Sequence, residues 1–505
     1  MGIYKFYAEY ITRLPRDIKP KRIAGLRGRK FDAVLIDANG VLHPIAQEVF
    51  QYAGGGKSVP QKKQSYEKYL SEYRDLLFET FDKLIMEAQT PKIVVIAVDG
   101  VAPAAKITQQ RARRYSAETT GDVAGGLFDS AMITPGTDFM ISVDAMILEY
   151  VDILVSAGHR VIYSSHMNPG EGEHKMFWIA KDLFADGTLP QNANVIVDGL
   201  DADLFMISLT AEFNVTLLRG DEYFEINSLK SYLQSILHAR QRRLPFQRVY
   251  EDFIIMLYLV GNDFLPKLDV LSNVRDLFDV FVEIHKELPR TISRGNGRID
   301  FAMLKQFFRG LAEREEGLLR QKTFEAASYF YPHRVLHSER VIEASRNKRQ
   351  SENEYMRLVS SGLYGSKNAM DIAYSYIDGI FWVFNYYTQK STWSKRWIYQ
   401  YDMAPLAKHL AQAMNNYSPP NELFSQDDFF TTSQQLVSVI PPRIAEKFLP
   451  KKISKFILQG GELEDMAPVK TQVVLSGIKK EKDVHMGKRL LPKLDVMRVI
   501  ETVKF

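Results

Sequence analysis

Residues 92–99, KIVVIAVD, place six apolar residues in a row directly before Asp99. An apolar run without alternation is typical of a strand that is buried on both faces of a parallel sheet. Three further apolar runs, at 31–37, 160–165 and 194–198, also lead into acidic residues, and stretches with helical periodicity separate the four runs. This alternation predicts an α/β fold in which a mostly parallel sheet is flanked by helices.

Six acidic residues follow these runs or occupy the turns beside them, and a seventh, Asp263, ends the helical run DFIIMLYLVGND. A single Asp after a strand is usually a turn or helix-cap residue, but the carboxyl ends of parallel strands meet at one edge of a sheet, where open α/β sheets bind ligands. Carboxylates crowded at that edge would repel one another unless cations neutralised them. Mg²⁺ and Mn²⁺ prefer oxygen ligands, and two such ions in one site can catalyse phosphoryl displacement. The predicted catalytic and metal-binding residues are Asp37, Asp99, Glu171, Glu173, Asp201, Asp203 and Asp263.

A basic cluster follows Asp99 in the stretch VAPAAKITQQRARRY, residues 101–115. Its members stand at positions i, i+4, i+7 and i+8, which share one face of a helix. A face with three cations and an amide suits a phosphate group, because arginine can bind phosphate oxygens with two parallel hydrogen bonds. A solvated amphipathic face is the alternative interpretation. The predicted phosphate-binding residues are Lys106, Gln110, Arg113 and Arg114.

Length and composition limit the class of protein. The 505 residues are enough for two or three domains, and 46% hydrophobic residues can form a large core. The net charge of +4 permits a nucleic-acid partner without requiring one, and the absence of cysteine excludes disulfides and cysteine zinc sites. No apolar segment resembles a signal peptide or a membrane span. We therefore expect a soluble, cytoplasmic protein without a membrane partner. The basic stretch 19–30 is expected to be a solvated loop, with RNA guidance and nuclear import as the alternatives.

The pattern changes along the chain. Strand and helix signals alternate up to residue 228, helical periodicity dominates afterwards, and a polar, charged stretch interrupts it. We expect a catalytic α/β region with the metal site at 1–320, a linker at 321–355, a largely helical second region at 356–450, and a C-terminal segment of unclear role at 451–505.

Seven motifs occur in the order found in a known nuclease family: MGIYKF, IDANGVLH, VDGVAPAAKITQQRARRY, FDSAMITPGTDFM, NPGEGEHK, GLDADLFMI and LVGNDFLP. They resemble the Xrn family of 5′→3′ exoribonucleases. The stretch GIFWVFNYYTQKSTWSKRWIYQYDMAP, residues 379–405, resembles the second conserved region of that family. The resemblance implies a PIN-like, Rossmann-like sheet and a helical second region that completes the active-site channel. It also implies a compact member without the long C-terminal extension of the large cytoplasmic members, of the kind expected in a virus or a divergent microbial eukaryote.

The resemblance also assigns roles to single residues. It implies that the seven acids hold two Mg²⁺ or Mn²⁺ ions and that the basic cluster binds the terminal 5′ phosphate of RNA. His43 is expected to stack on the first base, with Trp382 as its partner. Trp393 and Trp397 are the alternatives, and core packing is an equally good interpretation of each tryptophan. Lys175, next to the Glu pair, would contact phosphate or bridge the acids.

By this resemblance, the expected reaction is hydrolysis of single-stranded RNA with a 5′ monophosphate. It would release nucleoside 5′-monophosphates by two-metal-ion catalysis and serve RNA and mRNA decay. The sequence indicates no protein partner, although the decapping machinery is a candidate. Two alternatives stay open: a PIN-like 5′→3′ or flap DNA nuclease, and an RNA-binding or virion structural protein that has lost activity. The DNA nuclease would share the acids but not the basic cluster, and the intact acids argue against an inactive protein.

Overall fold

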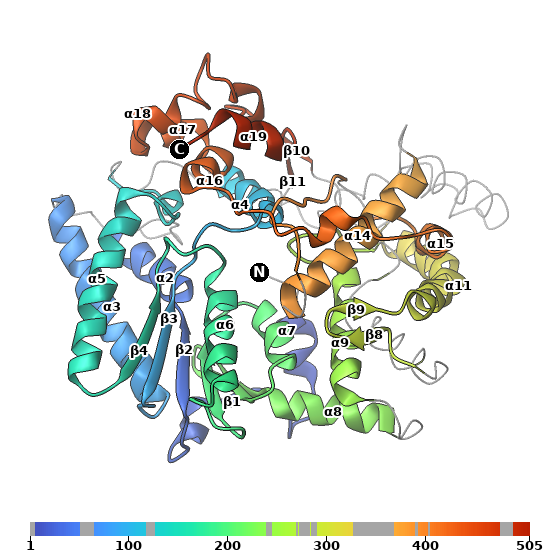
Figure 1. The fold of residues 1–505 in the computed structure, drawn as a ribbon, viewed down its shortest axis with the longest axis horizontal. Coiled ribbons are helices and arrows are strands. Elements are labelled where there is room, and N and C mark those ends of the chain that lie inside the picture. The colour runs from blue at the N-terminus through green and yellow to red at the C-terminus, as the bar shows by residue number, and fades with distance from the viewer. Residues whose placement is uncertain are drawn as a thin grey trace. The chain divides into compact units, whose positions relative to one another are not determined.

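Figure 1 shows the protein as a computed structural model. The structure describes residues 6–50, 65–117, 127–238, 245–268, 271, 283, 290–326, 368–388, 392–401, 404–474 and 488–505. The chain forms two compact units that interleave along the sequence. The α/β unit comprises Ile11–Tyr232, Asp427–Val469 and Pro492–Phe505, and the helical unit comprises Met1–Tyr10, Leu233–Gln426 and Lys470–Leu491.

The sequence analysis expected regions that follow one another along the chain, whereas these two units interleave. The boundaries of the expected regions stay a prediction. Helix α11 (Phe301–Ala326) continues through 321–326, the start of the expected linker. Glu, Gln, Lys and Ala all favour helix, so a polar composition alone does not end one. The rest of the expected linker and residues 356–367 lie outside the described residues.

A seven-stranded sheet organises the α/β unit, in the order β1-β7-β6-β5-β2-β3-β4. β2 pairs in parallel with both β3 and β5, β4 pairs in parallel with β3, and β6 with β5. Only β7 and β1, at one edge of this sheet, run antiparallel to their neighbours. The predicted mostly parallel sheet is confirmed. Its strands are β1 (Lys21–Arg22), β2 (Ala33–Asp37), β3 (Ile93–Ala97), β4 (Arg160–Ser164), β5 (Asn194–Asp198), β6 (Asn214–Arg219) and β7 (Glu222–Glu225).

Helices cover both faces of this sheet (Figure 1). On one face α2, α3 and α5 form a buried cluster with apolar side chains of β2 and β3. On the other face α6 packs on the same two strands. The continuous apolar runs are therefore buried from both sides. The helices are α2 (Ala38–Phe50), α3 (Tyr66–Glu87), α4 (Ala104–Ala117), α5 (Asp138–Ser156), α6 (Gly172–Ala185), α7 (Asp203–Leu209), α8 (Ile226–His238, which ends in the helical unit), α16 (Thr432–Val439), α17 (Pro442–Phe448), α18 (Lys451–Ser454) and α19 (Val496–Thr502), with 3₁₀ turns η1 (Ile11–Arg13), η2 (Ile23–Leu26), η5 (Ser130–Met132) and η8 (Glu464–Met466).

The helical unit is built mainly from helices, as predicted for the second region. α14 packs on α9 and α15, and α15 packs on α11. Among the described residues no helix is long and apolar enough to span a bilayer. The elements are α1 (Phe6–Glu9), α9 (Phe246–Leu257), η6 (Tyr258–Val260), α11, α14 (Ala369–Thr388), α15 (Ala407–Ala413), η7 (Asn421–Phe424) and two hairpins, β8 (Ser293–Gly295) with β9 (Arg298–Ile299) and β10 (Gln472–Val474) with β11 (Lys488–Leu490).

Candidate active site

Predicted acids lie at or after the carboxyl ends of three adjacent parallel strands, β5, β2 and β3. β2 lies between β3 and β5, so the chain order reverses beside it, and open sheets place their ligands at such a point. Asp37 is the last residue of β2, Asp99 follows the end of β3, and Asp203 begins α7 after β5. Glu173 comes from the first turn of α6, which packs on β2 and β3.

The pKa shifts of these acids show that they share one electrostatic environment. Burial raises the pKa of Asp37 well above its usual range, and the charges of Asp99 and Asp201 raise it further. Burial also raises the pKa of Glu173, and the charge of Asp203 adds to that shift. Six of the seven predicted acids are thus brought together: Asp37, Asp99, Glu171, Glu173, Asp201 and Asp203.

Backbone hydrogen bonds hold the two strand-end acids. The amide of Gly172 donates to Asp99 Oδ1 at 2.6 Å, and the amide of Asp99 donates to Asn39 Oδ1 at 2.9 Å. The amide of Asn39 in turn donates to Asp37 Oδ1 at 3.2 Å. A Cβ on residue 172 would lie 3.0 Å from Asp37 Oδ1 and 3.3 Å from Asp99 Oδ1. Glycine therefore keeps the space between these two carboxylates open.

The acid cluster has the chemistry of a divalent-cation site. Glu173 Oε2 is buried and accepts no hydrogen bond from any described residue, and crowded buried carboxylates need positive charge close to them. Lys106 supplies part of that charge, because its ammonium lies 2.5 Å from Glu171 Oε2. Within the described ranges no three acidic or histidine side chains already stand so that they could hold one ion. The oxygens fit Mg²⁺ or Mn²⁺ in kind, and we expect side chains to rotate toward a bound ion.

Helix α4 carries the predicted phosphate-binding residues, and it reaches the acids through the contact of Lys106 with Glu171. One turn further along, Gln110 is half-buried, and its Oε1 has no hydrogen-bond partner among the described residues. Arg113 is exposed. The alternative of a solvated face is not supported for Lys106, which is buried.

His43, on α2, lies beside the arginines of this helix. Burial lowers the pKa of His43 to about 4, and the charges of Arg114 and Arg113 add to that effect. The imidazole is therefore neutral at pH 7. The guanidinium of Arg114 also donates to the carbonyl oxygens of Ala131, at 2.8 Å, and Ile133, at 3.4 Å. The structure thus brings the predicted base-stacking histidine next to the predicted phosphate-binding residues.

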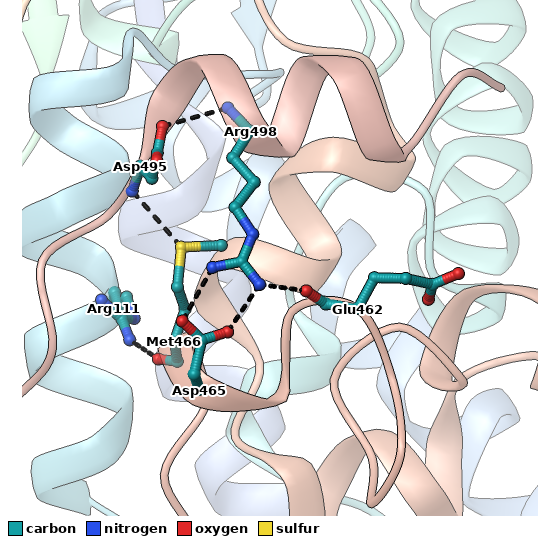
Figure 2. A network of polar contacts seen from close by, with 6 residues as sticks. All are labelled: Arg111, Glu462, Asp465, Met466, Asp495 and Arg498. Atoms are coloured by element: carbon teal, nitrogen blue, oxygen red, sulfur yellow. Dashed lines mark hydrogen bonds and ion pairs between the residues drawn. The ribbon is translucent and has the colours of Figure 1, made fainter.

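Another side of α4 is held by the C-terminal part of the α/β unit, as Figure 2 shows. The buried guanidinium of Arg111 donates to the carbonyl oxygen of Pro492 at 2.7 Å and also to that of Met466. Arg498, on α19, connects the segment after Pro492 to the one around Met466. It donates to both carboxylate oxygens of Asp465, at 2.7 and 2.8 Å. No sequence pattern indicates this role, because Arg111 is one of several cations in a basic run.

Lys175 does not take the predicted place at phosphate. Its ammonium is buried and donates to three carbonyl oxygens, those of Val98 at 2.7 Å, Ser165 at 2.7 Å and Asn168 at 3.0 Å. An ammonium has three hydrogens to donate, so none is left for phosphate. Lys175 instead joins the end of β3 to the loop before α6, on which Glu171 lies.

Trp382 is also placed differently from the prediction. It is 1% exposed, its Nε1 donates to the carbonyl oxygen of Ser394 at 2.7 Å, and its ring stacks against Tyr386 and Trp397. A ring enclosed in this way packs the core of the helical unit and does not stack on a base. Trp393 is buried as well, whereas Trp397 is only half-buried.

Two further acids complete the description. Asp263, the seventh predicted ligand, follows η6 in the helical unit, after Gly261 with φ +91°. Its membership of the metal site stays a prediction. Asp198 was missed, although it ends the apolar run of β5. Burial raises the pKa of Asp198 to about 7, and its charge raises the pKa of Asp37.

Comparisons with known proteins agree with these features. The family model described as the XRN 5′-3′ exonuclease N-terminus matches residues 1–221, and the model of the Xrn1 helical domain matches residues 243–363 and 354–505. The 5′-3′ exoribonuclease 1 of Saccharomyces cerevisiae is 30% identical over 330 residues, with 57% of this chain and 21% of that protein covered. Human 5′-3′ exoribonuclease 1 is 24% identical over 606 residues, with 100% of this chain and 34% of that protein covered.

The chain therefore spans between a fifth and about a third of the length of these two relatives. Among solved structures, the catalytic core of Rad2 in complex with a DNA substrate is similar at 16% identity and a TM-score of 0.36, with 64% of this chain and 80% of that chain covered. That similarity is too low to support an argument. The two family models, in contrast, cover most of the sequence, and the chain belongs to the Xrn family of 5′-3′ exonucleases.

Proposed function

We propose that this protein is a divalent-metal-dependent 5′→3′ exoribonuclease that hydrolyses single-stranded RNA with a 5′ monophosphate and releases nucleoside 5′-monophosphates. The observation that carries the proposal is the 2.5 Å ion pair between Lys106 and Glu171. It joins the helix with the basic cluster to the acid cluster, so a 5′ phosphate on α4 would lie beside the acids. We propose a role in cytoplasmic RNA and mRNA decay, with the decapping machinery as a candidate partner.

Each group of residues has one task in this proposal. Gln110 and Arg113 bind the terminal phosphate, with charge-assisted hydrogen bonds from the guanidinium. The neutral ring of His43 stacks on the first base, a contact that tolerates any sequence. The six gathered acids, with Asp263 as the proposed seventh, hold two Mg²⁺ or Mn²⁺ ions. Such ions supply an activated water and stabilise the leaving oxygen when they are bound.

The test compares RNAs of one sequence that carry a 5′ monophosphate, triphosphate or hydroxyl, together with a 5′-monophosphorylated DNA, all with Mg²⁺. We expect the monophosphorylated RNA to be degraded about 100-fold faster than the 5′-hydroxyl RNA, because charge-assisted hydrogen bonds to phosphate contribute about 1.5–3 kcal/mol each. The triphosphorylated RNA should also be degraded slowly, because the proposed site admits a single phosphate group. Equal rates on all three RNAs would contradict the phosphate assignment, and exclusive cleavage of DNA would favour a DNA nuclease. Asp201→Ala should remove cleavage and keep RNA binding.

A further inference from the structure

Four arginines of the helical unit line one cavity of about 460 Å³, which has no part in the function proposed above. Arg248 comes from α9, Arg290 precedes the β8–β9 hairpin, and Arg294 and Arg298 lie on its two strands. Like charges on a convex surface point apart, but a concave wall directs them at one volume and attracts an anion into it.

The charge of this cavity is largely uncompensated by the residues that line it. Arg294 forms an ion pair with Asp300, donating to Oδ2 from Nε at 3.0 Å and from Nη2 at 2.8 Å. Asp300 is the one acid among the described lining residues, so four positive charges and one negative charge leave +3. Arg248, Arg290 and Arg298 are exposed, and no ion pair to them occurs among the described residues.

The arginine-bearing hairpin is held rigidly to α9. Asp252, fully buried, accepts hydrogen bonds from the amides of Ile292 at 2.9 Å and Ser293 at 2.6 Å. The turn is Asn296–Gly297 with φ of +52° and +71°, and Asn-Gly is the preferred sequence of a two-residue hairpin turn. Because backbone anchors and turn geometry hold both strands, the backbone positions of Arg294 and Arg298 beside the cavity are set before any ligand binds.

We propose that this cavity binds phosphodiester groups of single-stranded RNA, as a second contact that is independent of the 5′ end. Guanidinium groups bind phosphate oxygens in pairs of hydrogen bonds, and a cavity of this size can take one nucleotide unit. No aromatic side chain is among the described lining residues, so the contact is to the backbone and not to the bases. The proposal rests on the proposed function for the identity of the polyanion.

The test is the salt dependence of binding to a 5′-hydroxyl oligouridine of thirty nucleotides, measured by fluorescence anisotropy on the full chain in EDTA. The variant is Arg248→Gln/Arg290→Gln/Arg298→Gln, which keeps Arg294 and its ion pair. We expect the variant to bind about tenfold more weakly at low salt. The slope of log K against log [salt] should decrease in magnitude by about 2, because each of the three lost phosphate contacts contributes about 0.7.

The charge-matched control is Arg16→Gln/Arg309→Gln/Lys452→Gln, three exposed residues outside this cavity. It should keep the wild-type slope. A wild-type slope in the cavity variant, or an equal loss in the control, overturns the proposal. Inorganic phosphate is titrated separately against the wild type and the cavity variant. If the variant loses phosphate binding but keeps the wild-type salt slope for RNA, the site takes free phosphate and the proposal is overturned. Cleavage of a 5′-phosphorylated trinucleotide by the wild type tests the proposed function alone.

Discussion

The ammonium group of Lys175 donates a hydrogen bond to the carbonyl oxygen of Val98 at 2.7 Å. Val98 is the residue before Asp99, and Lys175 follows Glu173 by two residues in α6. This single side chain therefore connects the backbone of two segments that deliver acids to the candidate active site. It does so from a buried position, where a bond to a charged donor is stronger than at the surface.

Replacement of this lysine should loosen the site and the fold together. Lys175→Met leaves the buried carbonyl group of Val98 and those of Ser165 and Asn168 without this donor, and we expect the free energy of unfolding to fall by about 2–3 kcal/mol. Urea titration measures the change. Lys83→Met is the control, because Lys83 is exposed and pairs only at 3.9 Å with Glu87. Equal stability of the two variants would contradict the structural role of Lys175.

Gly172→Ala tests the space between the strand-end carboxylates. The added Cβ would lie 3.0 Å from Asp37 Oδ1 and from the carbonyl oxygen of Ala97, so the carboxylates must move apart. Contacts of this length require the neighbouring atoms to shift by a few tenths of an ångström, so we expect cleavage to fall by about tenfold, less than the loss of about 100-fold that a displacement of about 1 Å causes. Binding of 5′-hydroxyl RNA in EDTA should change little. Wild-type cleavage by this variant would show that the spacing of the acids is unimportant.

The low pKa of His43 predicts a specific dependence of stability on pH. The folded chain takes up this proton only near pH 4, whereas an unfolded histidine takes it up near pH 6.5. Between these values the unfolded state binds more protons, so wild-type stability falls as the pH is lowered. His43→Phe removes this term, and its stability relative to wild type should rise by about 2 kcal/mol when the pH is lowered from 7.5 to 5. Urea titrations at both pH values measure it, and a constant difference would contradict the shift.

Arg111 should act on substrate affinity through the position of α4. Arg111→Met removes the bonds to Pro492 and Met466, and we expect KM for 5′-monophosphorylated RNA to rise about tenfold while kcat changes little, because phosphate binding is weakened uniformly. Cleavage of 5′-hydroxyl RNA should stay at its wild-type level. A merely structural loss would lower both activities equally. Arg498→Gln, in contrast, breaks an exposed ion pair with Asp465, and exposed pairs contribute little to stability.

The tryptophans of the second region should separate into core and surface roles. Trp382→Leu removes a fully buried ring, and we expect the free energy of unfolding to fall by about 3 kcal/mol. Quenching of tryptophan fluorescence by oligouridine should persist in this variant. The half-buried Trp397 is our proposed stacking partner, so Trp397→Leu should lose the quenching and be less destabilised. Loss of quenching in Trp382→Leu at a temperature where the variant is folded would reverse this assignment.

The sequence by itself determined the sheet and the place of most acids. Unbroken apolar runs such as IVVIAV are typical of a strand buried on both faces, and an acid at the carboxyl end of such a strand lies where that end of the sheet binds ligands. The spacing of Lys106, Gln110, Arg113 and Arg114 likewise placed them on one face of one helix. Both predictions depend on periodicity within a short stretch of sequence.

Only the tertiary structure decided which cations and rings face a ligand. Lys175 and Arg111 look like other basic residues in the sequence, yet their side chains donate hydrogen bonds to carbonyl oxygens of distant segments. Trp382 belongs to a matching motif, yet its ring is enclosed by Tyr386 and Trp397. Burial and hydrogen-bond partners depend on contacts between residues far apart in the chain, and no local pattern encodes them.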